Sequence, residues 1–366
     1  MPLRARSTRL AAFVLAATAA AATPAFAQQP AEPARHENDF ILQNFAFRSG
    51  EMLPQLRIHY TTLGEPARDA QGRVTNAVLI LHGTGGSGSN FLLPIFAGEL
   101  FGPGQLLDAS KYFIILPDGI GHGKSSKPSD GLRMKYPSYD YDDMVEAQYR
   151  LVTDGLGVNH LRLIMGTSMG CMHSFVWGEA HPDFMDALMP LACLPVQIAG
   201  RNRFWRKMAM DAIRDDPDWK NGDYTEEPRD ALRTWVDIVA IVGGTPRRMQ
   251  QAMPSREAVD RTMDEYYRTR TEHLDANDTL YQLNASRNYD PSPRLNLIQA
   301  PVMWINSADD FINPPELGIA EVQVKNIKNA RFILLPESEQ TFGHGTHTHA
   351  ATWKQYLAEL LNESNH

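Results

Sequence analysis

The feature that most constrains this chain is the pentapeptide G-T-S-M-G at residues 166–170. The apolar residues 161–165 before it predict a buried strand, and residues 171–181 after it predict a helix that ends before Pro182. A serine between small residues at such a junction is typical of a strained strand-to-helix turn, which lifts the hydroxyl above the sheet. The turn also places the hydroxyl at the amino end of the helix, where unpaired N–H groups favour negative charge. We therefore predict that Ser168 is a nucleophile.

Other apolar runs predict more strands, and helical segments separate several of them. Strands are expected at residues 40–47, 56–63, 77–81, 112–116, 187–194, 301–306 and 331–335, with helices at 141–156 and 353–361. This alternation predicts an α/β fold, a mainly parallel sheet with helices on both faces. Residues 195–294 contain no buried-strand runs and predict a helical lid inserted into the core. The expected domains are a signal peptide at 1–27, core segments at 28–194 and 295–366, and the lid at 195–294.

The amino terminus has the pattern of a secretory signal peptide. Three arginines precede an apolar run at residues 10–22, and residues 25–27 match the A-x-A cleavage pattern. We predict cleavage after Ala27 and a mature protein in the periplasm or outside the cell. An uncleaved anchor is the alternative, although the run is shorter than the roughly 20 residues that span a bilayer.

Charge and composition narrow the classes of partner. The chain has 366 residues and a formal net charge of −8. Cleavage after Ala27 removes three arginines and no acidic residue, which moves the charge to −11. An acidic surface argues against binding to nucleic acid or anionic membranes. No later stretch is long and apolar enough to span a membrane. We expect no cofactor and a small-molecule substrate, and a homodimer stays open.

The two cysteines, Cys171 and Cys193, have two interpretations. They could form a disulfide in an oxidising compartment, or they could be small buried core residues. Two cysteines in a chain of this size are not a disulfide framework, so the sequence leaves the choice open.

A serine nucleophile needs a base, and the base needs an acid to orient it. In strand–elbow–helix proteins the acid follows the serine in the chain and the histidine comes last. Asp309 and Asp310 both follow the strand expected at residues 301–306, where the carboxyl end of a strand faces the catalytic edge. We prefer Asp310, because it lies where the strand has turned into a loop, and Asp309 is the alternative.

The base is sought among the three histidines that follow the last predicted strand. His344 lies between two glycines, and we predict that it is the base. His347 and His349 could belong to the start of a helix. A zinc site is the alternative interpretation of the cluster, but no cysteine or acid is spaced with the histidines as a ligand. We therefore expect no metal.

An acyl-transfer intermediate also needs two backbone donors for its oxyanion. The residue after the nucleophile, Met169, supplies one, and Thr84 in the loop after the strand at residues 77–81 is the candidate for the other. His82 is expected to pack beneath this loop rather than to react. The glycine-rich residues 119–125 lack the spacing of a phosphate loop, so we interpret them as part of the catalytic rim.

Four apolar residues of the predicted lid have two interpretations. Phe204, Trp205, Met249 and Met253 could line an acyl pocket, or they could pack in the core of the lid, as apolar residues at helical spacing usually do.

Together these motifs resemble the α/β-hydrolase superfamily, and within it the homoserine acetyltransferase-like branch. The resemblance covers almost the whole mature chain. Its motifs are Y-T-T-L-G at 60–64, H-G-T at 82–84, G-T-S-M-G-C-M at 166–172, D-A-I, D-P-D-W and G-D-Y between 211 and 224, Asp310 before two prolines, and Gly343-His344. The resemblance implies an eight-stranded sheet, a helical lid and a triad of Ser168, His344 and Asp310.

Two departures from that branch bear on the substrate. Its transferases usually carry an arginine for the substrate carboxylate where this chain has Met210, and an acid for the amine where it has Gly345. Coenzyme A thioesters are also cytosolic, whereas export is predicted here. We therefore expect an exported serine hydrolase that cleaves a carboxylic ester through an acyl-enzyme. An O-acyltransferase and a non-catalytic binding protein are the alternatives. Acyl and alcohol specificity, and ester against lactone, stay open.

Overall fold

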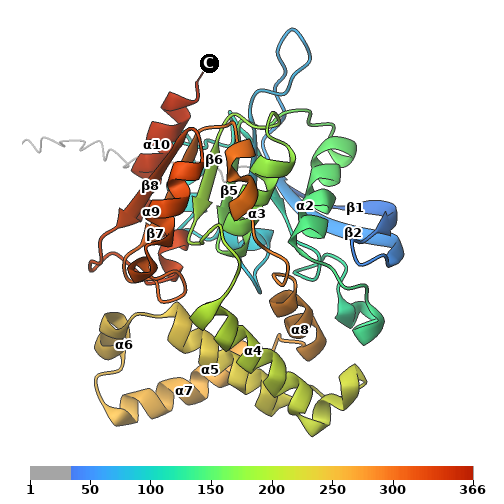
Figure 1. The fold of residues 1–366 in the computed structure, drawn as a ribbon, viewed down its shortest axis with the longest axis vertical. Coiled ribbons are helices and arrows are strands. Elements are labelled where there is room, and N and C mark those ends of the chain that lie inside the picture. The colour runs from blue at the N-terminus through green and yellow to red at the C-terminus, as the bar shows by residue number, and fades with distance from the viewer. Residues whose placement is uncertain (1–33, 366) are drawn as a thin grey trace, which may run out of the picture. The chain divides into compact units, whose positions relative to one another are not determined.

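An eight-stranded sheet organises the computed structural model, which describes residues 34–365 (Figure 1). The strand order is β1-β2-β4-β3-β5-β6-β7-β8. β2 is antiparallel to β1 and β4, and all the other neighbouring strands are parallel. The predicted mainly parallel sheet is confirmed. The strands are β1 (Arg35–Ala46), β2 (Met52–Leu63), β3 (Ala77–Leu81), β4 (Phe113–Pro117), β5 (Leu163–Thr167), β6 (Leu188–Leu191), β7 (Val302–Ser307) and β8 (Ala330–Leu335).

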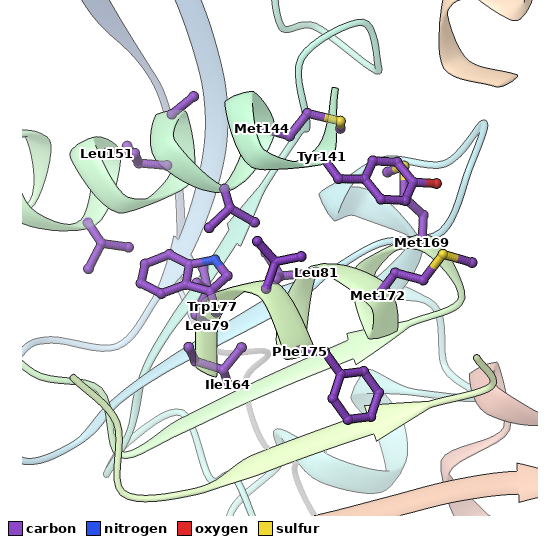
Figure 2. Close-up of a cluster of buried hydrophobic side chains, with 14 of the residues drawn as sticks. Leu79, Leu81, Tyr141, Met144, Leu151, Ile164, Met169, Met172, Phe175 and Trp177 are labelled. Carbon is purple, nitrogen blue, oxygen red and sulfur yellow. The ribbon is translucent and has the colours of Figure 1, made fainter. Parts of the chain in front are cut away.

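Two apolar cores cover the two faces of this sheet. Successive side chains of a strand point to opposite faces, so Leu79 packs with Trp177 on one face, while Ile80 packs with Trp353 on the other. Figure 2 shows the first core, where side chains from the strands meet those of two helices. That core includes side chains of α2 (Tyr141–Arg150), α3 (Met169–Ala180) and α9 (Ile319–Gln323), and the other those of α1 (Ala97–Leu100) and α10 (Lys354–Glu363).

Five α-helices lie between β6 and β7 in the chain and have a core of their own. α5 packs against α4 and α7, and α4 also packs against α8 (Figure 1). Met210 of α4, Leu232 of α5 and Leu283 of α8 are buried together in that core. The helices are α4 (Gly200–Asp215), α5 (Arg229–Gly243), α6 (Pro246–Ala252), α7 (Arg256–Thr271) and α8 (Ala276–Asn284), and we call them the inserted helices.

The signal peptide predicted at residues 1–27 lies outside the described residues. Within residues 34–365, no helix combines the length and the apolar character needed to cross a membrane.

Candidate active site

Ser168 lies on the tight turn that joins β5 to α3. Its φ of +54° is in the left-handed region, which a residue with a side chain rarely adopts. The flanking glycines make the turn sterically feasible. A Cβ on Gly166 would lie 1.9 Å from the Gly170 carbonyl oxygen, and one on Gly170 would lie 2.0 Å from the Leu81 carbonyl oxygen. The glycines therefore allow α3 to start against β3 and β5, which presents the Ser168 hydroxyl beyond the end of the sheet.

Three residues that are far apart in the chain form one hydrogen-bonded relay. The Ser168 hydroxyl lies 2.8 Å from His344 Nε2, and His344 Nδ1 lies 2.9 Å from Asp310 Oδ2. Ser168 and His344 are 176 residues apart in sequence. They meet because β5, β7 and β8 are parallel, so the segments that follow them emerge at the same end of the sheet. The structure thus brings together the three residues that the sequence analysis chose as nucleophile, base and acid.

Asp310 is fully buried, yet its surroundings favour the ionised form. Burial alone would raise the pKa of Asp310, but His344, the Asn313 amide and the Ile312 N–H outweigh burial and hold the pKa below its usual value. Asn313 Nδ2 donates to Asp310 Oδ2 at 3.0 Å, and the Ile312 N–H donates to Asp310 Oδ1 at 2.8 Å. A carboxylate in this position can hold His344 in the tautomer with its proton on Nδ1.

Asp309, the alternative acid, has a different role that sequence reasoning missed. Its carboxylate accepts hydrogen bonds from the Thr341 hydroxyl at 2.8 Å and from the Gly343 N–H at 3.1 Å. The Ser307 hydroxyl also donates to it. Asp309 therefore holds the loop that carries His344 rather than the imidazole itself.

The two predicted oxyanion donors flank Ser168. A Cβ built on Gly83 would lie 3.2 Å from Ser168 Cβ, so the loop that contains Thr84 passes directly beside the serine. The N–H groups of Thr84 and Met169 donate to no other atom within the described residues. His82 braces this loop, because its Nδ1 lies 2.8 Å from the Gly83 carbonyl oxygen and its Nε2 accepts from the Gly119 N–H at 2.9 Å.

The other two histidines of the last loop lie outside the relay. His347 is partly buried, and desolvation of its ring lowers its pKa to about 3, so it stays neutral. His349 stacks on Phe342, with ring centroids 3.5 Å apart. Among residues 34–365, no three or more histidine, cysteine or acidic side chains are grouped to hold a metal ion.

A cavity of about 440 Å³ separates the relay from the inserted helices. Ser168 and His344 line it from the sheet side, and Trp205, Trp235 and Val239 are among the residues that line it from α4 and α5. Of the four apolar residues singled out in the sequence, only Trp205 lines this cavity. Phe204 is mostly exposed, and neither Met249 of α6 nor Met253, which directly follows that helix, lines the cavity.

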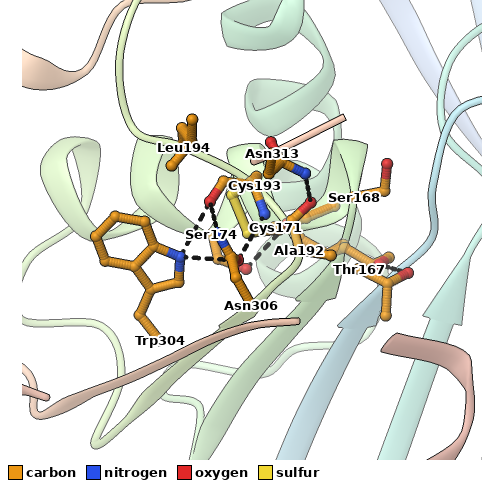
Figure 3. Close-up of a disulfide and its surroundings, with 12 residues drawn as sticks. Thr167, Ser168, Cys171, Ser174, Ala192, Cys193, Leu194, Trp304, Asn306 and Asn313 are labelled. Atoms are coloured by element: carbon orange, nitrogen blue, oxygen red, sulfur yellow. Dashed lines mark hydrogen bonds between the residues drawn. A yellow bond between two sulfur atoms is a disulfide. The ribbon is translucent and has the colours of Figure 1, made fainter. Parts of the chain in front are cut away.

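A disulfide joins Cys171 to Cys193, which settles the alternative left open by the sequence (Figure 3). Cys171 lies in the first turn of α3, and Cys193 lies two residues after the end of β6. The Ala192 carbonyl oxygen, next to Cys193, accepts a hydrogen bond from Asn313 Nδ2 at 3.0 Å. Because Asn313 also bonds Asp310, the disulfide links the elbow helix to the segment that supports the acid.

Comparisons with known proteins agree with the fold. The alpha/beta hydrolase fold family matches residues 76–343. A homoserine O-acetyltransferase of Moorella thermoacetica is 31% identical over 309 residues, covering 73% of this chain and 80% of that protein. The solved homoserine O-acetyltransferase of Bacillus anthracis has a TM-score of 0.78 at 22% identity, over 90% of this chain and 98% of that one. The solved structure of esterase E22 has a TM-score of 0.77 at 18% identity, over 90% of this chain and 100% of that one. The chain thus belongs to the α/β hydrolase family, where it is an enzyme of the homoserine acetyltransferase-like branch.

Proposed function

We propose that this protein is an exported serine hydrolase that cleaves a carboxylic ester through an acyl-enzyme. The observation that carries the proposal is the relay of Ser168, His344 and Asp310 at the wall of a cavity large enough for a small ester. Ester-cleaving solved relatives such as esterase E22 support the reaction class by their fold alone.

The proposed mechanism assigns one step to each group. Ser168 Oγ attacks the ester carbonyl carbon while His344 Nε2 takes the hydroxyl proton. The N–H groups of Thr84 and Met169 stabilise the oxyanion. His344 then returns the proton to the departing alcohol, which leaves an acyl group on Ser168. Water, activated by His344, then releases the carboxylic acid from Ser168. Asp310 stabilises the His344 imidazolium during both acylation and deacylation.

Replacement of the nucleophile tests this proposal. Ser168→Ala should lower kcat for a 4-nitrophenyl ester by a factor on the order of 10⁶, because no other group can form the acyl-enzyme. A fluorophosphonate probe should label the wild type and fail to label Ser168→Ala. Ser110→Ala, at an exposed serine, is the matched control. Ester cleavage by Ser168→Ala at the wild-type rate would refute the proposal.

Acyl transfer to an alcohol is the second candidate, supported by the acetyltransferase named among the relatives. It uses the same groups, with an acceptor alcohol in place of the water that attacks the acyl-enzyme. Product analysis with an ester donor and a competing alcohol separates the two reactions. A transfer yield far above the alcohol's share of the nucleophiles present would favour transfer over hydrolysis.

Export is the third part of the proposal. The disulfide between Cys171 and Cys193 supports it, because disulfides persist mainly in oxidising compartments. Amino-terminal sequencing of protein recovered from the periplasm or medium should begin at Gln28. Recovery in the cytosol with Met1 retained would contradict export.

A further inference from the structure

The cavity beside Ser168 contains a buried cation. Arg206 of α4 lines this cavity and is only 3% exposed. Arg270 of α7 lines it as well, whereas no aspartate or glutamate does among the described residues. A cavity with two guanidinium groups and no carboxylate has a positive potential, which favours an anionic ligand.

Arg206 has only neutral partners within the described residues. Its Nε donates to Asn202 Oδ1 at 3.0 Å, its Nη1 donates to Ser286 Oγ at 3.3 Å, and its guanidinium carbon lies 4.7 Å from the Trp205 ring centroid. No acidic side chain acts on its charge there, and its hydrogen bonds come from Nε and Nη1 rather than Nη2. Burial lowers the pKa of Arg206, but a guanidinium stays protonated at neutral pH. A buried charge without a counter-ion is costly, which suggests that a ligand supplies one.

Three further polar groups nearby also have no partner. Thr84 Oγ1, the Tyr141 hydroxyl and Trp205 Nε1 are buried and form no hydrogen bond within the described residues. Burial raises the pKa of Tyr141, while Arg206, Ser286 and Thr84 lie close enough to its hydroxyl to lower that pKa in part. The Arg206 guanidinium and the hydroxyls of Thr84 and Tyr141 therefore lie close together, and Arg206 and Thr84 line the cavity. Each of these groups can donate a hydrogen bond, and a carboxylate can accept about four hydrogen bonds.

We propose that Arg206, with the hydroxyl of Thr84, binds a carboxylate on the substrate. This inference rests on the proposed ester cleavage and names its substrate class: esters that carry a negative charge. Thr84 connects the two sites, because its side chain lies beside the Tyr141 hydroxyl while its N–H flanks Ser168. No lining acid could pair with an ammonium group, so the class is anionic rather than zwitterionic.

Matched pairs of esters test the class and show which half carries the charge. For the acyl half, 4-nitrophenyl hemisuccinate is compared with 4-nitrophenyl butyrate. For the alcohol half, 4-acetoxybutanoate is compared with 4-acetoxybutanamide. Charge-assisted hydrogen bonds should give at least one anionic ester a kcat/KM roughly ten- to a hundredfold above that of its neutral partner. Wild-type enzyme that prefers the neutral ester in both pairs would overturn the inference.

Substitution of the arginine tests its role. Arg206→Met should lower the ratio of anionic to neutral kcat/KM by the same ten- to hundredfold, and Arg206→Lys should restore part of it. Arg203→Met on the same helix is the control, because Arg203 does not line this cavity, and its ratio should match the wild type. An unchanged ratio in a folded Arg206→Met would show that the guanidinium serves packing alone.

A binding measurement separates this inference from the catalytic proposal and needs no Arg206 variant. Succinate titrated calorimetrically into the Ser168→Ala protein should bind saturably, and succinamide should not. Succinate binding by a protein that cleaves no ester would refute the hydrolase proposal and leave the anion site standing. Ester cleavage without succinate binding and without a preference for anionic esters would refute the anion site and leave the hydrolase proposal standing.

Discussion

The disulfide between Cys171 and Cys193 should stabilise the fold and support the active site together. The two residues are 22 positions apart. In the chain-entropy model, closing a loop of that size destabilises the unfolded ensemble by about 3 kcal/mol at 25 °C. Both sulfur atoms are buried, so reduction requires unfolding first. Protein unfolded and refolded with reductant should therefore lose about 3 kcal/mol in free energy of unfolding, measured by urea denaturation against oxidised protein.

The same perturbation has a catalytic readout. The segment with Cys193 carries the Ala192 carbonyl that holds Asn313, and Asn313 bonds Asp310. Reduced protein that remains folded should therefore show a lower kcat with little change in KM. A variant with both Cys171→Ala and Cys193→Ala is the control, since reductant should leave it unaffected. If thiol alkylation proves complete reduction while stability and kcat both stay at oxidised values, the reasoning fails.

Three more measurements address the acid, the elbow and a buried carboxyl. Asp310→Asn should lower kcat for ester cleavage by a factor on the order of 10⁴, because it favours the wrong tautomer of the His344 imidazole. Asp309→Asn should lower kcat far less. Equal losses of kcat in the two variants would contradict the assignment of Asp310 as the acid. Gly170→Ala should lower the free energy of unfolding, measured by urea denaturation, by at least about 1–3 kcal/mol, because the new Cβ would lie 2.0 Å from a backbone oxygen. Gly243→Ala is the control, because a Cβ there meets no atom within 4 Å. Similar losses of stability in the two variants would refute the steric argument. Burial raises the pKa of Glu179 from 4.5 to about 7, so the stability that this carboxyl contributes is complete below pH 4.5 and is lost as pH rises through about 7. The stability of the wild type relative to Glu179→Gln should fall over that window, and a pH-independent difference would count against the raised pKa.

Much of the core could be predicted from local sequence alone. Buried strands such as residues 77–81 are continuous apolar runs, since parallel strands are covered on both faces. The elbow is equally local, because Gly166 and Gly170 are required by contacts within a few residues and with the adjacent strand. The helix predicted at 141–156 differs in detail: it is α-helical to Arg150 and continues as a wider π-helical turn at Leu151–Gly155.

Contacts between residues far apart in the chain determine the acid, the disulfide and the buried arginine, which the pattern of apolar residues does not predict. The choice between Asp309 and Asp310 depends on hydrogen bonds to residues more than thirty positions away, which set the loop register. The disulfide required β6 to end beside the first turn of α3. Arg206 was missed for the same reason: one turn before Met210 on an amphipathic helix, it is a charged residue that sequence alone would leave in solvent. Local sequence determines which face of an element is apolar, whereas only the packed chain decides which distant groups, and which buried charge, share one cavity.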